Sequence, residues 1–472
     1  MNAIVPAPPA GYGSSPKSSP GTERPAAGRP HSMLGDGVQT LATNLIQVVC
    51  VLGSTAVVAR ALGPSVKGAY DLCLATAQLI FTISALSLPG GLTFVVASGK
   101  GDVRRWRKFV YGIALLLGGC GAGLLLAARA LGSLHSFLPT NVGLAGIVFV
   151  SLTVASLAAG ALARALVVGL REFRRANMGD LVKQGTAFLL LPAAILLTRG
   201  RPAGFRVIVF LATNFCATLC AIYAYDRPLR ARPPRTRALA WGTALRFSMP
   251  AFLGDILQFI NYRLGVYYVN AYDGTRAVGL FQSSAFVCQS LWLLPTAMAT
   301  IIFPHVANSS AQGRDQTGTT ALCSRLALWS GIACAVPLAI AAPILIPLFF
   351  GNAFRESVPL LWLMLPGTIA LCPAKVIASY LAGIGMPRWN LYGAAAGAVA
   401  IFTLTALMVP KYGCRGAAAA TSVSHMVNSC VLIAFFVRRT GAPLRRVLVP
   451  GAQEVDLARN WVRKWRSTGR WV

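Results

Sequence analysis

The sequence predicts an all-α polytopic membrane protein, with about twelve transmembrane helices in two similar six-helix bundles around a central cavity. The 472-residue chain is 55% hydrophobic and only 12% charged, with a mean hydropathy of +0.62. Soluble domains carry about 25% charged residues, so this chain has too few charges to cover a surface in water. Apolar runs of about 20 residues, which suffice to cross a bilayer, recur along its whole length.

The apolar runs place the spans in order along the chain. Several of these spans contain prolines, which membrane helices tolerate as kinks when neighbouring helices satisfy the freed carbonyl groups. The twelve predicted spans lie roughly at residues 37–59, 69–98, 108–131, 142–166, 177–198, 204–225, 246–270, 278–305, 321–350, 357–384, 389–409 and 414–437.

The charge balance concerns orientation in the membrane. A net charge of +30 in a soluble protein would indicate binding to nucleic acid. Here the cations lie mostly between apolar runs, so we expect no nucleic-acid partner. When the N-terminus is placed inside, most Lys and Arg fall on the cytoplasmic side, as the positive-inside rule requires. We therefore expect a multi-pass inner-membrane protein with both termini in the cytoplasm.

The two ends differ in composition from the spans. Residues 1–33 are rich in Pro, Gly and Ser and predict a disordered cytoplasmic tail. Residues 438–472 form a basic cytoplasmic tail, in which Leu457, Trp461 and Trp465 recur every four residues with arginines around them. This spacing favours an amphipathic helix on an anionic membrane surface, with an unstructured basic end as the alternative.

An internal repeat divides the chain. A shift of 211 residues places Gln47 on Gln258, Gly63 on Gly274 and Gln78 on Gln289 without a gap. The predicted domains are an N-terminal lobe at 34–225 and a C-terminal lobe at 243–437, joined by a basic cytoplasmic linker at 226–242. Each lobe holds an even number of spans, so the two repeats are parallel and enclose a cavity between them.

Polar residues gather in the first span of the second lobe. Asp255, Gln258 and Tyr262 follow the spacing i, i+3, i+7 of one helical face, with Asn261 and Arg263 beside them. An arginine that faces lipid at the bilayer centre costs at least about 2.5–3.5 kcal/mol. We therefore expect Arg263 to point into a water-filled cavity.

Two interpretations of Arg263 remain open. It pairs with Asp255 or another acid and holds helices together, or it joins Lys375 in giving the cavity a positive potential that attracts an anionic substrate. Thirteen acidic residues against 43 Lys and Arg favour the second interpretation. The polar side chains predicted to line the cavity, or alternatively to bond helices together, are Gln47, Asp255, Gln258, Asn261, Tyr262 and Gln289.

No cofactor, metal or catalytic site is expected. The eleven cysteines form no CxxC pair and the four histidines lie far apart in sequence. No Walker motif is present, which argues against direct use of ATP.

Several motifs together resemble one family of transporters. They are ARALGPSVKGAYDL from Ala59, SMPAFLGDILQFINYRLGVYYV from Ser248, FGNAFRESVPLLWLMLPG from Phe350, SYLAGIGMPRWNLY from Ser379 and VPKYGCRGAAAATSVSH from Val409. Over about residues 36–437 the chain resembles Wzx-type polysaccharide flippases of the multidrug/oligosaccharidyl-lipid/polysaccharide (MOP) exporter superfamily. The resemblance implies a fold like that of the multidrug and toxic compound extrusion (MATE) transporters.

The resemblance also implies an activity. Such proteins are not enzymes; they move an undecaprenyl-diphosphate-linked oligosaccharide from the cytoplasmic to the periplasmic leaflet by alternating access, for exopolysaccharide, capsule or O-antigen synthesis. Arg263 and Lys375 would then bind the headgroup, and other polysaccharide assembly proteins would be partners. In this family an acid often follows the Arg-Leu pair, where this chain has Gly265, which leaves the coupling ion open.

Three other functions compete with this one. A cation-coupled multidrug exporter of the same fold would need acids in its cavity. A lipid II flippase typically has fourteen spans. A membrane-embedded glycosyltransferase or polymerase would need catalytic acids and usually a large extramembrane loop, whereas the connections here are short and basic.

Overall fold

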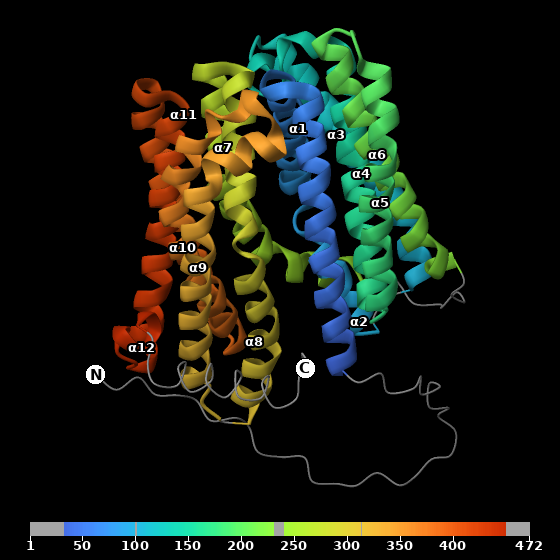
Figure 1. Cartoon of the computed structure of the whole chain (residues 1–472). Helices are drawn as coiled ribbons and strands as arrows, with labels where there is room; N and C mark the ends of the chain where they lie inside the picture. The colour runs from blue at the N-terminus through green and yellow to red at the C-terminus, as the bar shows by residue number, and fades with distance from the viewer. Residues whose placement is uncertain (1–32, 100–101, 231–239, 313, 450–472) are drawn as a thin grey trace, which may run out of the picture.

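The computed structural model describes residues 33–99, 102–230, 240–312 and 314–449, and its regular structure there is helical without a strand (Figure 1). The predicted N-terminal tail up to residue 32, most of the predicted linker and the amphipathic segment after residue 449 lie outside the described residues. The helices are α1 (Met33–Ala85), α2 (Leu88–Ala97), α3 (Val103–Ala130), α4 (Gly143–Gly169), α5 (Phe173–Thr198), α6 (Ala203–Arg230), α7 (Trp241–Ser290), α8 (Leu293–Ala311), α9 (Thr317–Phe350), α10 (Ser357–Gly383), α11 (Arg388–Thr440) and α12 (Leu444–Leu448).

Three of these helices are too long for a single crossing. α1 and α11 each have 53 residues and α7 has 50. At 1.5 Å per residue these helices are roughly 75–80 Å long, whereas the hydrocarbon core of a bilayer is about 30 Å thick. Each long helix contains one glycine with a positive φ, namely 69° at Gly63, 76° at Gly274 and 56° at Gly413. Glycine takes this conformation without the steric penalty of a Cβ, so the helix direction changes there. Pro64 follows Gly63 at the first position of the next segment, where its missing N–H costs nothing.

The predicted fold class is confirmed. By length and hydropathy, eight of the described helices can cross a membrane, or nine when the bent pair α7 and α8 counts as one span. In that number, α1 and α11 each count as one crossing, although a glycine break divides each of them into two segments. Division at the three glycines, with α2 and α8 joined to the segments that they continue, yields twelve segments in the described residues, and these correspond in place to the twelve predicted spans.

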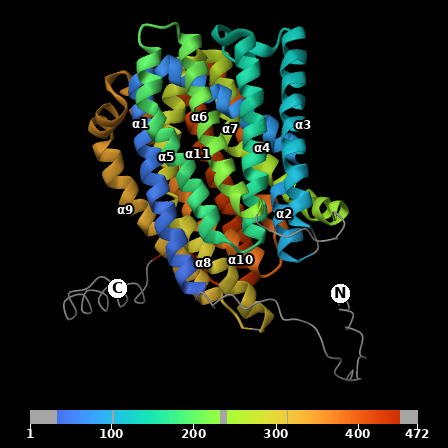
Figure 2. The ribbon, with the colours of Figure 1, turned by 90° about the vertical axis from the view of Figure 1, so that its right-hand side faces the viewer.

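The helices form two groups that stand side by side. α1 to α6 pack together through the pairs α3 with α4, α5 with α6 and α4 with α6, while α7 to α11 pack through α10 with α11, α7 and α9. Figure 1 shows the second group on the left and the first on the right, and Figure 2 views the molecule from the side of the first group. α6 extends to Arg230 and α7 begins at Trp241, so the helices reach into both ends of the predicted linker.

The two groups touch at both ends: at one end α1 and α7 cross reciprocally just after their glycine breaks, and at the other end α2 packs against the start of α7. A Cβ at Gly68 would clash with the backbone oxygen of Thr275, and a Cβ at Gly279 would clash with that of Pro64. The shift of 211 residues maps Gly68 on Gly279 and Pro64 on Thr275, so each repeat makes the same contact with the other. This is the geometry that a two-fold relation between repeats produces.

Further contacts join the groups at this same end of the molecule. The Arg60 guanidinium donates to the carbonyl oxygens of Phe349, at 3.0 Å, and of Leu348, at the C-terminal end of α9. Asn270 Nδ2 donates to the carbonyl oxygen of His135 at 3.1 Å. We call the end that carries these contacts and the Gly68–Gly279 crossing the closed end.

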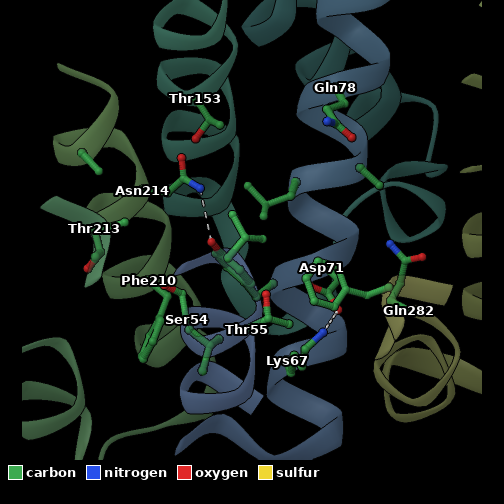
Figure 3. Close-up of a pocket in the computed structure, with 18 of the residues that line it drawn as sticks. Ser54, Thr55, Lys67, Asp71, Gln78, Thr153, Phe210, Thr213, Asn214 and Gln282 are labelled. Atoms are coloured by element: carbon green, nitrogen blue, oxygen red, sulfur yellow. Dashed lines mark hydrogen bonds and ion pairs between the residues drawn. The ribbon is translucent and has the colours of Figure 1, made fainter. Parts of the chain in front are cut away.

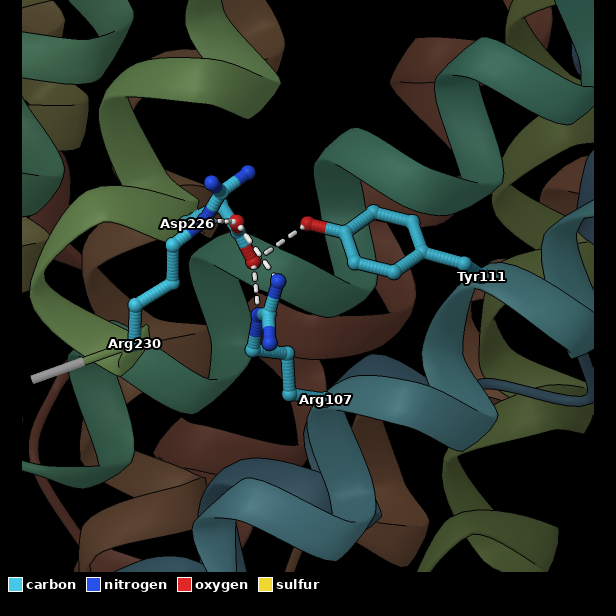
Figure 4. Close-up of polar contacts among 4 residues, drawn as sticks. All are labelled: Arg107, Tyr111, Asp226 and Arg230. Atoms are coloured by element: carbon cyan, nitrogen blue, oxygen red, sulfur yellow. Dashed lines mark hydrogen bonds and ion pairs between the residues drawn. The ribbon is translucent and has the colours of Figure 1, made fainter. Parts of the chain in front are cut away.

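A buried charge cluster lies at the opposite end and fastens α3 to α6 (Figure 4). Asp226, which is 2% exposed, accepts from Arg107 Nε at 2.5 Å, from Tyr111 Oη at 2.7 Å and from Arg230 Nε at 2.5 Å. Both carboxylate oxygens are thus paired with donors. The cluster therefore stabilises the packing of the last turn of α6 against α3.

Candidate functional site

A cavity of about 360 Å³ lies among α1, α4, α5, α6 and α7 (Figure 3). Both segments of α1 line it, as do both segments of α7, so the cavity contacts the two helix groups at once. The charged side chains that line it are Lys67, Asp71, Lys183 and Arg263; its polar side chains include Gln78, Asn214, Gln282 and Gln289. We call it the Arg263 cavity.

Lys67 and Asp71 form an ion pair inside the Arg263 cavity, with 2.5 Å between Lys67 Nζ and Asp71 Oδ2. Both belong to the segment of α1 that starts after Gly63, and their spacing of four residues places them on one helical face. Their side chains are only 4% and 14% exposed. A buried pair of this kind is neutral as a unit, and removal of either member leaves the other charge unpaired.

Arg263 enters the same cavity from α7 and forms no ion pair with any described residue. The charge that acts on it most is that of Asp71 on the other helix group. Asp255, which we considered as its partner from the sequence, instead accepts a hydrogen bond of 2.8 Å from Ser87 Oγ. The structure thus contradicts a pair between Arg263 and Asp255 as the reason for this arginine.

The cavity carries a surplus of positive charge. Among the described residues that line it, three cations face one carboxylate, which leaves a net charge of +2. Lys183 likewise forms no ion pair with any described residue, and its neighbour Asp180 is paired with Arg164 at 3.0 Å. Charges within a partly enclosed apolar wall interact more strongly than in water, so this cavity favours anions.

Lys375 lies in a different hollow. A second pocket of about 260 Å³, lined by residues of α7, α8, α10 and α11, includes Lys375, Gln258 and Tyr262. The Lys375 ammonium stands 4.5 Å from the centre of the Trp292 ring, a cation–π arrangement. We call this hollow the Lys375 pocket. The predicted combination of Arg263 and Lys375 in one cavity is therefore not found.

The remaining predicted residues fall in three places. Gln289 lines the Arg263 cavity. Asn261 lines neither hollow; it is 3% exposed, donates to the carbonyl oxygens of Leu257 and Ala394 at 2.9 Å and accepts from Ser424 Oγ at 3.0 Å. It thus fills the alternative role of a bond between helices. Gln47 is half-buried and lines neither hollow.

Lys67, Asp71 and Gln282 line the cavity although they are not among the predicted site residues. Lys67 falls between the predicted spans 37–59 and 69–98, because charges normally end an apolar run. The repeat carried a signal for the others, since the shift of 211 residues that maps Gln78 on Gln289 also maps Asp71 on Gln282, and all four line the cavity. Polar residues at matching repeat positions therefore mark the side of α1 and α7 that faces the cavity.

Within the described part of the chain, no group of three or more His, Cys, Asp or Glu could hold a metal ion. No protein-family model matches the sequence, and no curated protein matches it either. Solved structures, in contrast, match over most of their length.

Three matching structures are all transporters. The lipid II flippase MurJ in an inward closed conformation has a TM-score of 0.67 at 13% identity, covering 87% of this chain and 89% of that one. A MATE family multidrug resistance transporter of the MOP superfamily, inward-facing, has a TM-score of 0.66 at 16% identity, covering 85% and 96%. A MOP superfamily transporter from Pyrococcus furiosus, whose reversed pocket polarity suggests a different function, has a TM-score of 0.59 at 13% identity, covering 87% and 95%. The chain therefore has the fold shared by MATE transporters and the lipid II flippase of the MOP superfamily.

Proposed function

We propose that this protein is a flippase that moves an undecaprenyl-diphosphate-linked oligosaccharide from the cytoplasmic to the periplasmic leaflet of the inner membrane, for exopolysaccharide, capsule or O-antigen synthesis. A sugar chain and a diphosphate cannot cross hydrocarbon unaided, because transfer of their polar and charged groups from water is too costly. The protein supplies a polar, cationic path for this headgroup while the prenyl tail remains in lipid.

The observation that carries the proposal is the surplus charge of the Arg263 cavity. A diphosphate that links a prenyl chain to a sugar has two ionised oxygens and a charge of −2. The cavity has a net charge of +2 and contacts both lobes. Arg263 supplies a planar fork of donors suited to phosphate oxygens, and Lys67 and Lys183 supply point charges.

The proposed cycle is alternating access by the N-terminal lobe, 34–225, and the C-terminal lobe, 243–437. The lobes rock about the cavity, and the contacts of the closed end separate while the lobes move further together at the opposite end, where α2 already packs against the start of α7. We place the closed end on the periplasmic side of the membrane and both termini in the cytoplasm. Exposed Arg438, Arg439, Arg445 and Arg446 lie at the C-terminal end of the described chain, where they suit anionic lipid headgroups; other polysaccharide assembly proteins are further partners.

Two alternative functions have specific observations to weigh. A cation-coupled multidrug exporter shares the fold, but a drug cation would meet Lys67, Lys183 and Arg263 in the cavity. Lipid II is also a prenyl-diphosphate-linked sugar, and its flippase has this fold. Efflux of a cationic dye tests the first alternative, and rescue of cells depleted of their lipid II flippase tests the second.

The experiment that tests the proposal is polysaccharide export in cells that carry Arg263→Glu, Arg263→Ala or Arg263→Lys. We expect no export with Glu or Ala and partial export with Lys, which keeps the charge but not the fork. Arg276→Ala serves as the matched control, since Arg276 is on the same helix with its side chain 54% exposed. Normal export by all three variants would refute the proposed role, as would failure of the variants to accumulate in the membrane while Arg276→Ala accumulates.

A further inference from the structure

The Lys375 pocket contains a half-buried positive charge that the proposed headgroup site does not use. Lys375 makes no ion pair or hydrogen bond with any described residue; its one charge contact is the face of Trp292. A lysine ammonium has three donors, and even partial removal of an unpaired charge from water has a cost. The face of one aromatic ring offsets only part of that cost.

The pocket also offers hydrogen-bond acceptors. Asn390 and Asn428 line it, and the Oδ1 atoms of both are buried and lack a donor among the described residues. Asn390 Nδ2 is already used, because it donates to the carbonyl oxygen of Ala378 at 2.9 Å. Gln258 and Tyr262 add further polar groups on the α7 side. A ligand that suits this pocket therefore combines one anionic group, for Lys375, with hydroxyl donors, for the amide oxygens.

The two hollows lie on different sides of α7. Tyr262 lines the Lys375 pocket and Arg263, the next residue, lines the Arg263 cavity. Successive residues of an α-helix point about 100° apart, so one helix separates the two sites. A ligand group held in one hollow cannot also be held by the cation of the other.

The net charge of each site can be compared with the charges of the proposed substrate. The net charge of +2 in the Arg263 cavity already balances the −2 of a diphosphate, which leaves Lys375 for one more negative charge. We infer that the Lys375 pocket is a second subsite, which binds the carboxylate and neighbouring hydroxyl groups of an acidic sugar in the transported oligosaccharide. This inference rests on the proposed flippase function and adds the class of sugar to it.

The test is ligand-induced stabilisation of the purified full-length protein in detergent. The probes are sodium glucuronate as the acidic sugar, glucose as its neutral counterpart, sodium chloride at equal ionic strength, and inorganic pyrophosphate for the Arg263 cavity. The variants are Lys375→Met, which keeps the length and apolar stem of the side chain, Lys375→Arg, which keeps the charge, and Lys183→Met, which removes a half-buried cation from the Arg263 cavity.

We expect glucuronate to raise the unfolding temperature of the wild type beyond the effect of glucose and sodium chloride. Lys375→Met should weaken glucuronate binding at least about tenfold, the effect of losing a charge-assisted hydrogen bond. Lys375→Arg should retain most of it. Lys183→Met should bind glucuronate as the wild type does and should bind pyrophosphate more weakly.

Two results would overturn the inference. One is that glucuronate stabilises the wild type no more than glucose does. The other is that Lys375→Met, folded and as stable as the wild type without ligand, binds glucuronate normally while Lys183→Met does not. Both results leave the headgroup site intact, because that site is tested by pyrophosphate alone, and a failure of pyrophosphate to bind counts against the proposed function instead.

Discussion

The Arg263 cavity and the Lys375 pocket surround their cations in different ways. In the cavity, buried Lys67 is neutralised by Asp71 at 2.5 Å, and half-buried Arg263 adds its charge without an ion pair to any described residue. In the pocket, half-buried Lys375 lies against the ring of Trp292 and has no described carboxylate as a partner. The comparison indicates that the fully buried cation Lys67 depends on a carboxylate for its stability, whereas the half-buried cations do not.

The stability of variants at Asp71 and Lys375 should differ more than that of any other variants proposed below. Asp71→Asn should lower the free energy of unfolding by about 3–5 kcal/mol, because it leaves Lys67 buried without a partner. Lys375→Met removes a half-buried charge that no described carboxylate neutralises, so it should leave stability unchanged or raise it. Unfolding of both purified variants by denaturing detergent measures the contrast.

The double variant Lys67→Met with Asp71→Asn is the control for the Asp71 prediction. It removes both charges and should recover most of the lost stability, since a buried pair and an apolar pair of similar volume differ little. Equal losses in Asp71→Asn and Lys375→Met would show that the two sites do not differ in this way.

An intermediate effect is expected at Asn261, which lies in α7 between the residues of the two sites. Asn261→Ala removes the bonds to the Ala394 carbonyl and Ser424 hydroxyl, and should lower the free energy of unfolding by about 1–3 kcal/mol. Stabilisation of the folded variant by pyrophosphate and by glucuronate should persist. Loss of either response would show that Asn261 belongs to a binding site.

The smallest effect is expected at Asp255. This residue is exposed and bonds Ser87 Oγ, so Asp255→Asn should change stability by no more than about 0.5 kcal/mol and leave export unchanged. Polysaccharide export by Asp255→Asn, measured in parallel with export by Arg263→Ala, tests this prediction. If Asp255→Asn lost export as Arg263→Ala does, the two residues would act as a pair after all.

The fold class and the breaks of the long helices could be predicted from the sequence. Hydropathy over about 20 residues and the share of charged residues are local properties, and lipid admits helices but not open chain. The repeat placed Gly63 opposite Gly274, and both take a positive φ. The spacing of Asp255, Gln258 and Tyr262 predicted a shared face; Gln258 and Tyr262 both line the Lys375 pocket, whereas Asp255 does not.

Which hollow each polar side chain enters depends on the packing between helices, which the sequence does not reveal. Helical periodicity relates Tyr262 to Arg263 by an angle, but it does not say which neighbouring helix covers each direction, and α1 and α11 cover different ones. Which charges lie near one another is decided in the same way, because the crossing of α1 and α7 brings Asp71 and Arg263, 192 positions apart in the sequence, into one cavity. Composition and periodicity are properties of a segment, whereas the pairing of buried charges depends on packing between segments.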